Sequence, residues 1–152
     1  MALLNIIKAG HPVLKEISQP VDKITKEIKR LLDDMAETMY DQEGVGLAAP
    51  QVNVSVRIVV LDDGSGLIEL INPVIIACSG SVVGTEGCLS VPGLYGEVER
   101  YSDITVEALN RKGRPIRYEV NGFLARIFQH EIDHLNGELF IEKTTSLHKV
   151  EL

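Results

Sequence analysis

His130 and His134 are four positions apart, and Glu131 lies between them in the segment QHEIDH at 129–134. In a helix, residues i and i+4 lie one turn apart on the same face, so both imidazoles can reach one ion. The carboxylate of Glu131 emerges beside them, where it can handle the proton of a water bound to that ion. The HExxH spacing therefore predicts a hydrolytic metal site on a helix.

A third ligand is expected because hydrolytic sites commonly have three protein ligands and a water. The sequence follows the pattern HExxHxxGxxH as far as Gly137, but Phe140 stands where the third histidine belongs. Nothing in the later sequence selects one of its conceivable ligands, which are Glu138, Glu142, His148 and Glu151. The usual protease ligand sets are therefore poorly supported.

Two upstream cysteines are the better candidates. Cys78 lies in the apolar run at 74–78, where a thiol is expected to be a small buried hydrophobe. Cys88 follows Gly87 and is followed shortly by VPG at 91–93, so it lies where a strand gives way to a turn. We therefore expect Cys88 to be the third ligand.

The segment GVGLAAPQ at 44–51 has two glycines and two alanines. So little side-chain bulk would allow the backbone of a ligand to lie close to it. It lacks the Gly-Lys-Ser/Thr ending of a phosphate-binding loop and, taken alone, would be interpreted as a turn. Gln51 offers an uncharged amide N–H, a donor that can stabilise an oxyanion.

Three motifs in this order resemble the peptide deformylase family: GVGLAAPQ at 44–51, EGCLS at 86–90 and QHEIDH at 129–134. The resemblance implies hydrolytic removal of the formyl group from N-formylmethionine on newly made polypeptides, with release of formate. It implies a metal-bound water that attacks the formyl carbon. It assigns the metal to Cys88, His130 and His134, the general base and acid to Glu131, and the oxyanion contacts to the Gln51 amide and the Leu89 backbone N–H.

The resemblance also implies a metal and a substrate site. One divalent ion is expected, with Fe(II) favoured and zinc, nickel or cobalt able to occupy the same ligands. The backbone of Val45 and Gly46 would pair with the incoming peptide in extended form. By helical position, Phe123 and Ile127 lie on the face of His130 and, with Val45, are expected to wall an apolar pocket for the methionine side chain.

Charged residues near the motifs are expected to orient the site. Glu86 and Asp133 fit this role, and we expect Arg100 to pair with Asp133. Two alternatives stay open from the residues alone: an HExxH metalloprotease or amidase, and a non-catalytic metal-binding module. The second would need a fourth protein ligand to close the site, and no obvious one is placed.

The elements that must position these residues indicate an α+β domain. An apolar stripe at 24–39 predicts an amphipathic helix with Asp22 as its N-cap. A second helix is predicted from Asn121 to about 136, closed by Gly137. Strands are predicted at 54–61, 67–77, 81–84, 96–101, 104–110 and 115–120, with a hairpin at 110–114. We expect mixed, mainly antiparallel strands packed around a central HExxH-bearing helix, with the amphipathic helix N-terminal to them.

Composition restricts the partners and the location. The 152 residues carry a net charge of −7 and fit one catalytic domain over 1–152. Direct nucleic-acid recognition is not expected without a basic patch, and no apolar run approaches the roughly 20 residues that span a bilayer. We expect a cytoplasmic protein that acts on N-formylmethionyl nascent peptides. Because only 18 residues follow His134, any ribosome contact is expected to be transient.

Overall fold

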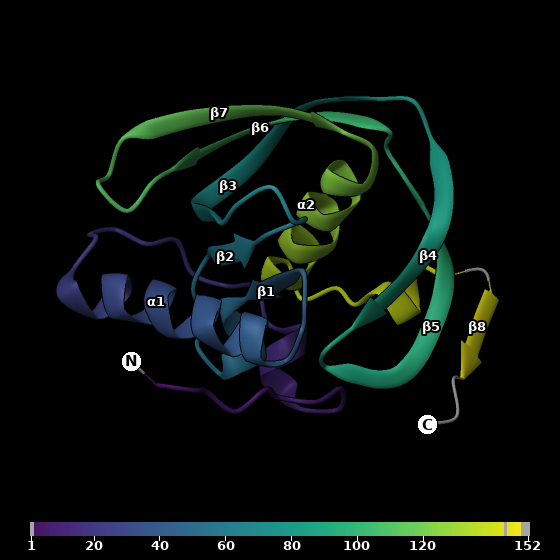
Figure 1. Ribbon diagram of the computed structural model, residues 1–152, viewed down its shortest axis with the longest axis horizontal. Helices are drawn as coiled ribbons and strands as arrows, with labels where there is room; N and C mark the ends of the chain where they lie inside the picture. Colours follow the sequence, from purple (N-terminus) through teal and green to yellow (C-terminus); the bar gives the residue numbers. More distant parts are fainter. Residues whose placement is uncertain (1, 145, 150–152) are drawn as a thin grey trace.

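The computed structural model describes residues 2–144 and 146–149 (Figure 1). Helices and strands are segregated along the chain, which confirms the α+β class. Within the described residues the helices are α1 (Lys26–Asp41) and α2 (Gly122–Leu135), with short 3₁₀ turns η1 (Pro12–Lys15), η2 (Ala49–Val52) and η3 (Phe140–Glu142). The strands are β1 (Gly46–Ala48), β2 (Ile58–Leu61), β3 (Ile68–Ser79), β4 (Val82–Cys88), β5 (Val91–Arg100), β6 (Asp103–Leu109), β7 (Pro115–Asn121) and β8 (Ser146–Lys149).

The strands form two antiparallel sheets. The larger has the order β1-β2-β3-β6-β7 and the smaller the order β4-β5-β8. The predicted hairpin between β6 and β7 is present, because the backbone N–H of Gly113 donates to the carbonyl of Asn110 and Leu109 pairs with Pro115. Figure 1 shows α2 in the middle of the molecule, between the larger sheet and the curved β4–β5 hairpin.

Strand β2 explains how the larger sheet is held between the two helices. Successive side chains of a strand point to opposite faces, and all four of this strand are buried. Val59 and Leu61 belong to the apolar cluster that includes Phe128 of α2. Ile58 and Val60 belong to a second cluster formed with α1, whose buried members include Leu32, Met35 and Met39. The order of layers is therefore α1, sheet, α2.

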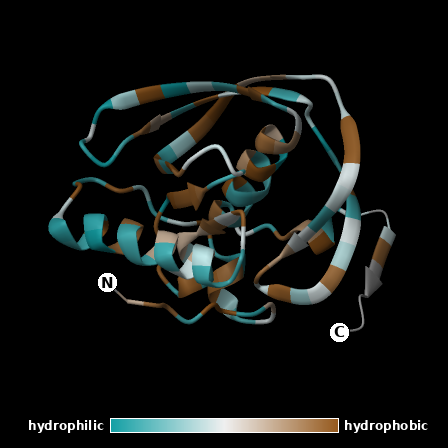
Figure 2. Ribbon diagram, viewed as in Figure 1, coloured by the Kyte–Doolittle hydropathy of each residue, from teal (hydrophilic) through white to brown (hydrophobic). Residues whose placement is uncertain are grey.

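Helix α1 is amphipathic, with hydrophilic residues on the face turned away from the sheet (Figure 2). It begins at Lys26, three residues later than the predicted N-cap Asp22 would place its first residue. The N-cap is Thr25, whose hydroxyl oxygen accepts a hydrogen bond from the backbone N–H of Ile28. The assignment of Asp22 as the cap was wrong, because a threonine directly before the first helical turn already satisfies one of the free N–H groups.

The outer half of β3 corrects a second expectation. Cys78 is exposed, as are Val74 and Ile76 in the same run. Within β3, only residues 68–71 pair with β2, so the later part of β3 extends beyond the helix-covered region and pairs with β6 alone. The apolar run therefore does not bury this thiol. Among the described residues, no helix combines the length and the apolar character needed to cross a membrane.

Candidate metal centre

Helix α2 carries both histidines to the interior. His130, Glu131 and His134 are all buried, although each is polar. The helix ends at Leu135, and Gly137 then turns the chain with a φ of +75° directly against the backbone of Lys15. A side chain at this position would be strained and would clash with that backbone. The last turn of α2, which holds His134, is thereby packed against the N-terminal segment.

Cys88 lies at the end of β4, where the hairpin turns into β5. Cys88 pairs with Val91, and the register shifts between Glu86 and Cys88. An irregularity of this kind re-aims side chains next to a turn. The sulfur of Cys88 consequently lies 3.3 Å from Nε2 of His134 on the central helix.

The three predicted ligands meet in one place. One donor atom each of Cys88, His130 and His134 lies within 4.8 Å of the others. Nδ1 of His130 is 2.9 Å from Glu86, which leaves Nε2 of that ring for a metal. One sulfur and two imidazole nitrogens are the donors that borderline divalent metals such as zinc and iron accept in proteins.

The charges around the centre also fit a cation. Burial disfavours a charged His130, but Cys88, Glu131 and Glu86 outweigh burial and raise the pKa of His130 well above its usual value. Burial lowers the pKa of His134 well below its usual value, which keeps that ring neutral. Negative groups therefore surround the place where the neutral ring of His134 and the sulfur of Cys88 come together. Such surroundings would stabilise a divalent cation bound there.

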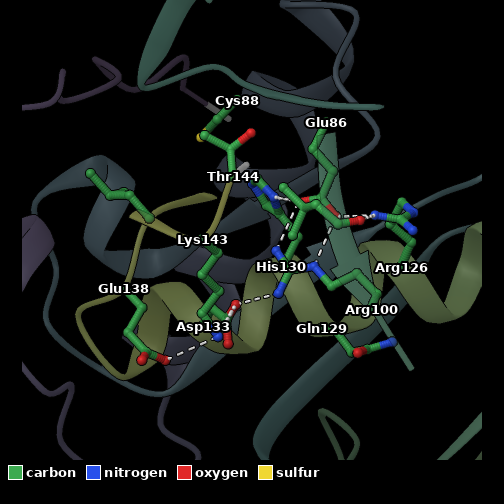
Figure 3. Close-up of polar contacts among 12 residues, drawn as sticks. Glu86, Cys88, Arg100, Arg126, Gln129, His130, Asp133, Glu138, Lys143 and Thr144 are labelled. Atoms are coloured by element: carbon green, nitrogen blue, oxygen red, sulfur yellow. Dashed lines mark hydrogen bonds and ion pairs between the residues drawn. The ribbon is translucent and has the colours of Figure 1, made fainter. Parts of the chain in front are cut away.

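Glu86 links His130 to two arginines (Figure 3). Its Oε1 atom is 2.9 Å from Nδ1 of His130 and accepts a bond of 2.8 Å from Arg100. Its Oε2 atom accepts from Nε of Arg100 at 2.8 Å and from Arg126 at 2.7 Å. Burial opposes the charge, but these contacts together hold the pKa of Glu86 far below its usual range. The predicted pairing of Arg100 with Asp133 is also present, at 2.5 Å.

Glu131 lies beside His130, and one of its carboxylate oxygens makes no hydrogen bond within the described part of the chain. Its Oε1 atom is buried and has no hydrogen-bond partner among the described residues, and Oε2 is 4.0 Å from Nε2 of His130. Burial raises the pKa of Glu131 to about 7, so this carboxyl can both take and return a proton near neutral pH. A Cβ atom at Gly46 would lie 2.5 Å from Oε2, so a larger residue there would force this carboxylate or β1 to shift.

The glycines of the 44–51 segment also have a role in packing that was not expected. Gly46 lies against Glu131, and Gly44 lies against the side chain of Leu89. The segment is not simply a turn, because β1 pairs with β2 and a 3₁₀ turn follows.

Gln51 is oriented toward Cys88 by three contacts. Its Oε1 atom accepts from the backbone N–H of Ala48 at 2.9 Å. Its Nε2 atom donates to the Ser90 hydroxyl at 3.1 Å and lies 3.4 Å from the sulfur of Cys88. With 1% of its surface exposed, Gln51 lies behind Cys88, and its amide N–H faces the metal ligands.

A cavity of about 480 Å³ opens beside the centre. Cys88, His130 and Glu131 contribute to its wall, and so does Leu89. The four residues predicted to contact substrate also line it, namely Val45, Gly46, Phe123 and Ile127. Ile127 is buried at 4% exposure, whereas Phe123 is 58% exposed. The cavity therefore has an apolar wall that runs from the ligands toward solvent.

Of the other conceivable ligands, the two whose side chains the structure describes form ion pairs elsewhere. Glu138 forms an ion pair with Lys143, and Glu142 pairs with Lys15. Phe140 packs its ring against His130, with ring centroids 6.0 Å apart. Glu151 lies outside the described residues, and the side chain of His148 is not described.

Sequence reasoning missed two buried polar residues at the site. Ser90 holds the amide of Gln51, and Arg126 holds Glu86. Arg126 could have been found, because it precedes His130 by four positions and so lies on the same helical face. Ser90 gave no such signal, because its contact depends on how the β4–β5 hairpin folds against η2.

An α+β fold that gathers a thiol, two imidazoles and a buried carboxylic acid beside a cavity defines the class of metal-dependent hydrolases. A family model described as "Polypeptide deformylase" matches residues 3–150. The chain belongs to the peptide deformylase family, whose metal-dependent enzymes remove the formyl group from N-formylmethionine.

Individual relatives agree with this assignment. The chain is 53% identical over 150 residues to a peptide deformylase of Pelotomaculum thermopropionicum, covering 99% of this chain and 97% of the relative. It is 58% identical over 149 residues to that of Halothermothrix orenii, covering 97% of each. The crystal structure of peptide deformylase from Thermotoga maritima is similar with a TM-score of 0.94 and 42% identity, covering 95% of this chain and 99% of that one.

Proposed function

We propose that Cys88, His130 and His134 hold one divalent ion and that Glu131 is the acid/base of deformylation. The observation that carries this proposal is the approach of the three donor atoms to within 4.8 Å beside the buried carboxyl of Glu131. The ion, when bound, supplies Lewis acidity and lowers the pKa of a hydrolytic water. We favour Fe(II), and zinc, nickel and cobalt suit the same donors.

The residues around the ion divide the remaining work. Glu131 accepts the proton of the attacking water and returns it to the leaving amine. The formyl oxygen gains negative charge during the attack and needs donors aimed at it. We assign these donors to the amide of Gln51, whose Nε2 atom is 3.4 Å from the Cys88 sulfur, and to the backbone N–H of Leu89, the residue after Cys88.

The free edge of β1 is suited to an extended peptide. The carbonyl of Val45 accepts from the N–H of Asp62, and Gly46 pairs with Leu61. In an antiparallel ladder this places Gly46 in a non-hydrogen-bonded pair, so its own N–H and carbonyl point away from β2. Because β1 is an edge strand, a substrate can add to it and leave its first side chain toward the apolar wall.

Substitution of Phe123 tests whether the cavity wall contacts the methionine side chain of the substrate. Replacing Phe123 with alanine is expected to lower kcat/KM for an N-formylmethionyl peptide about 5- to 10-fold, because part of an apolar contact is lost. The loss should appear mainly in KM and should be smaller for an N-formylalanyl peptide, whose side chain does not reach the wall. Steady-state kinetics on both peptides measure it.

A matched control separates the pocket from surface effects. Val74 is also an exposed apolar residue, at 56%, but it lies on the outer half of β3, away from the cavity. The Val74→Ala variant should keep wild-type kinetics on both peptides. Equal losses on the two peptides for Phe123→Ala would contradict the assignment of the pocket.

We further propose that residues 1–152 form a single catalytic domain, organised around α2 as its central helix and supported by the amphipathic α1. The match of the family model to 3–150 supports this extent. We place the protein in the cytoplasm, where nascent N-formylmethionyl peptides arise, with at most transient contact to the ribosome.

A further inference from the structure

Arg126 is a buried arginine of α2 that lies one turn before His130. It is 7% exposed, and its guanidinium makes three hydrogen bonds. Nη1 donates to Oε2 of Glu86 at 2.7 Å and to the carbonyl of Val98 at 2.9 Å, and Nη2 donates to the carbonyl of Val82 at 2.9 Å. A planar guanidinium with several donors can satisfy such a set, whereas an ammonium presents a point charge.

These acceptors all belong to the hairpin that carries Cys88. Val82 and Glu86 lie on β4, and Val98 lies on β5. The metal ligands thus come from two separate parts of the chain, with two histidines on α2 and the cysteine on the β4–β5 hairpin. Arg126 joins the two parts through three bonds within 3 Å.

The same contacts fix the orientation of His130. Glu86 accepts from Arg126 at one oxygen and contacts Nδ1 of His130 with the other. Figure 3 shows Glu86 between His130 and the two arginines, with Arg126 reaching it from the helix. An uncharged residue in place of Arg126 would remove one of the bonds that hold this carboxylate, and Arg100 alone would then have to align it.

Gly84 gives independent evidence that the guanidinium is seated against the hairpin. A Cβ atom at Gly84 would lie 3.0 Å from the Cζ, Nε and Nη2 atoms of Arg126. A side chain at this position would therefore force the guanidinium to shift by a few tenths of an ångström. The hairpin therefore has a glycine where the arginine lies flat on its backbone.

We propose that Arg126 is a positioning residue of the metal centre: it clamps the Cys88 hairpin onto α2 and, through Glu86, orients His130. The inference rests on the proposed ligand set but not on the proposed catalytic steps. Groups that orient metal ligands typically affect metal affinity 10- to 100-fold when they are changed. Arg126 acts here on two of the three ligands at once.

The test is metal binding by an Arg126→Met variant, which keeps the aliphatic stem that lines the cavity and removes the guanidinium. Co(II) is used as the probe, with affinity measured by chelator competition and the ligand environment by the thiolate-to-Co(II) absorption. We expect affinity to fall about 10- to 100-fold and the thiolate band to weaken or shift. Both readouts are independent of catalysis, so a failure of the proposed reaction would leave them interpretable.

Arg111→Met is the matched control. Arg111 also holds two carboxylates, Glu69 and Asp33, but it lies in the β6–β7 turn and not at the centre. Its loss should leave Co(II) affinity and spectrum unchanged, whatever it does to the melting temperature. Wild-type affinity and spectrum in folded Arg126→Met would overturn the proposal.

Gly84→Ala decides the question if Arg126→Met does not fold. This substitution keeps the Arg126 side chain and adds one methyl group, which forces its guanidinium to shift by a few tenths of an ångström. We expect a weaker form of the same change, with lower Co(II) affinity and an altered thiolate band. A Gly84→Ala protein with wild-type affinity and spectrum would equally overturn the proposal.

Discussion

Replacing Glu131 with glutamine is expected to lower kcat for formate release by about 10²- to 10⁴-fold, the usual contribution of a general acid/base. Glutamine keeps the shape of the side chain but cannot accept the proton of the attacking water. The bound metal should stay at one ion per chain, because Glu131 is not among the three proposed ligands. Metal analysis and initial rates on an N-formylmethionyl peptide measure the two effects together.

Glu119→Gln is the control for a change of charge alone, because Glu119 is an exposed carboxylate on β7. It should show wild-type rates and metal content. If Glu131→Gln lost its metal together with its activity, Glu131 would have to be treated as a ligand. If it kept near wild-type activity, its role as acid/base would be wrong.

Replacing Cys88 with alanine is expected to abolish both metal binding and formate release. Two imidazoles would remain, and hydrolytic sites rarely hold an ion with fewer than three protein ligands. The loss is expected to be larger than that from any residue outside the ligand set. Metal content after dialysis measures it, together with formate release after addition of Fe(II) under anaerobic conditions.

The chain provides its own control in its second cysteine. Cys78 is exposed on the outer half of β3, so Cys78→Ala should bind metal and release formate as the unmodified protein does. A Cys88→Ala protein that kept a stoichiometric ion would contradict the proposed ligand set.

The two histidines of the proposed ligand set could be predicted because their spacing is local. His130 and His134 are one helical turn apart, and this relation needs only that the segment be helical. Cys88 could be chosen over Cys78 from its neighbours, although the reasoning about Cys78 itself was wrong. Burial of Cys78 depends on where β2 ends beside β3, which no pattern within residues 74–78 reveals.

The contacts between distant segments were harder to predict. The pairing of Arg100 with Asp133 was expected and is present, but the clamp of Arg126 on the hairpin was not. The role of Gly46 was likewise missed, because its close neighbour Glu131 is 85 positions away in the sequence. Strands β1 and β8 were not predicted. The three residues of β1 are too few for an alternating pattern.

The most direct test of this account follows a short N-formylmethionyl peptide with protein purified anaerobically and loaded with Fe(II). We predict formate and a peptide with a free methionine amino group in equal amounts, no product from the metal-free protein, and recovery when Fe(II) is added back. Cleavage of an internal peptide bond without formate would contradict the account and favour a protease. No product from folded, metal-loaded protein would contradict it as well and favour a metal site without this activity.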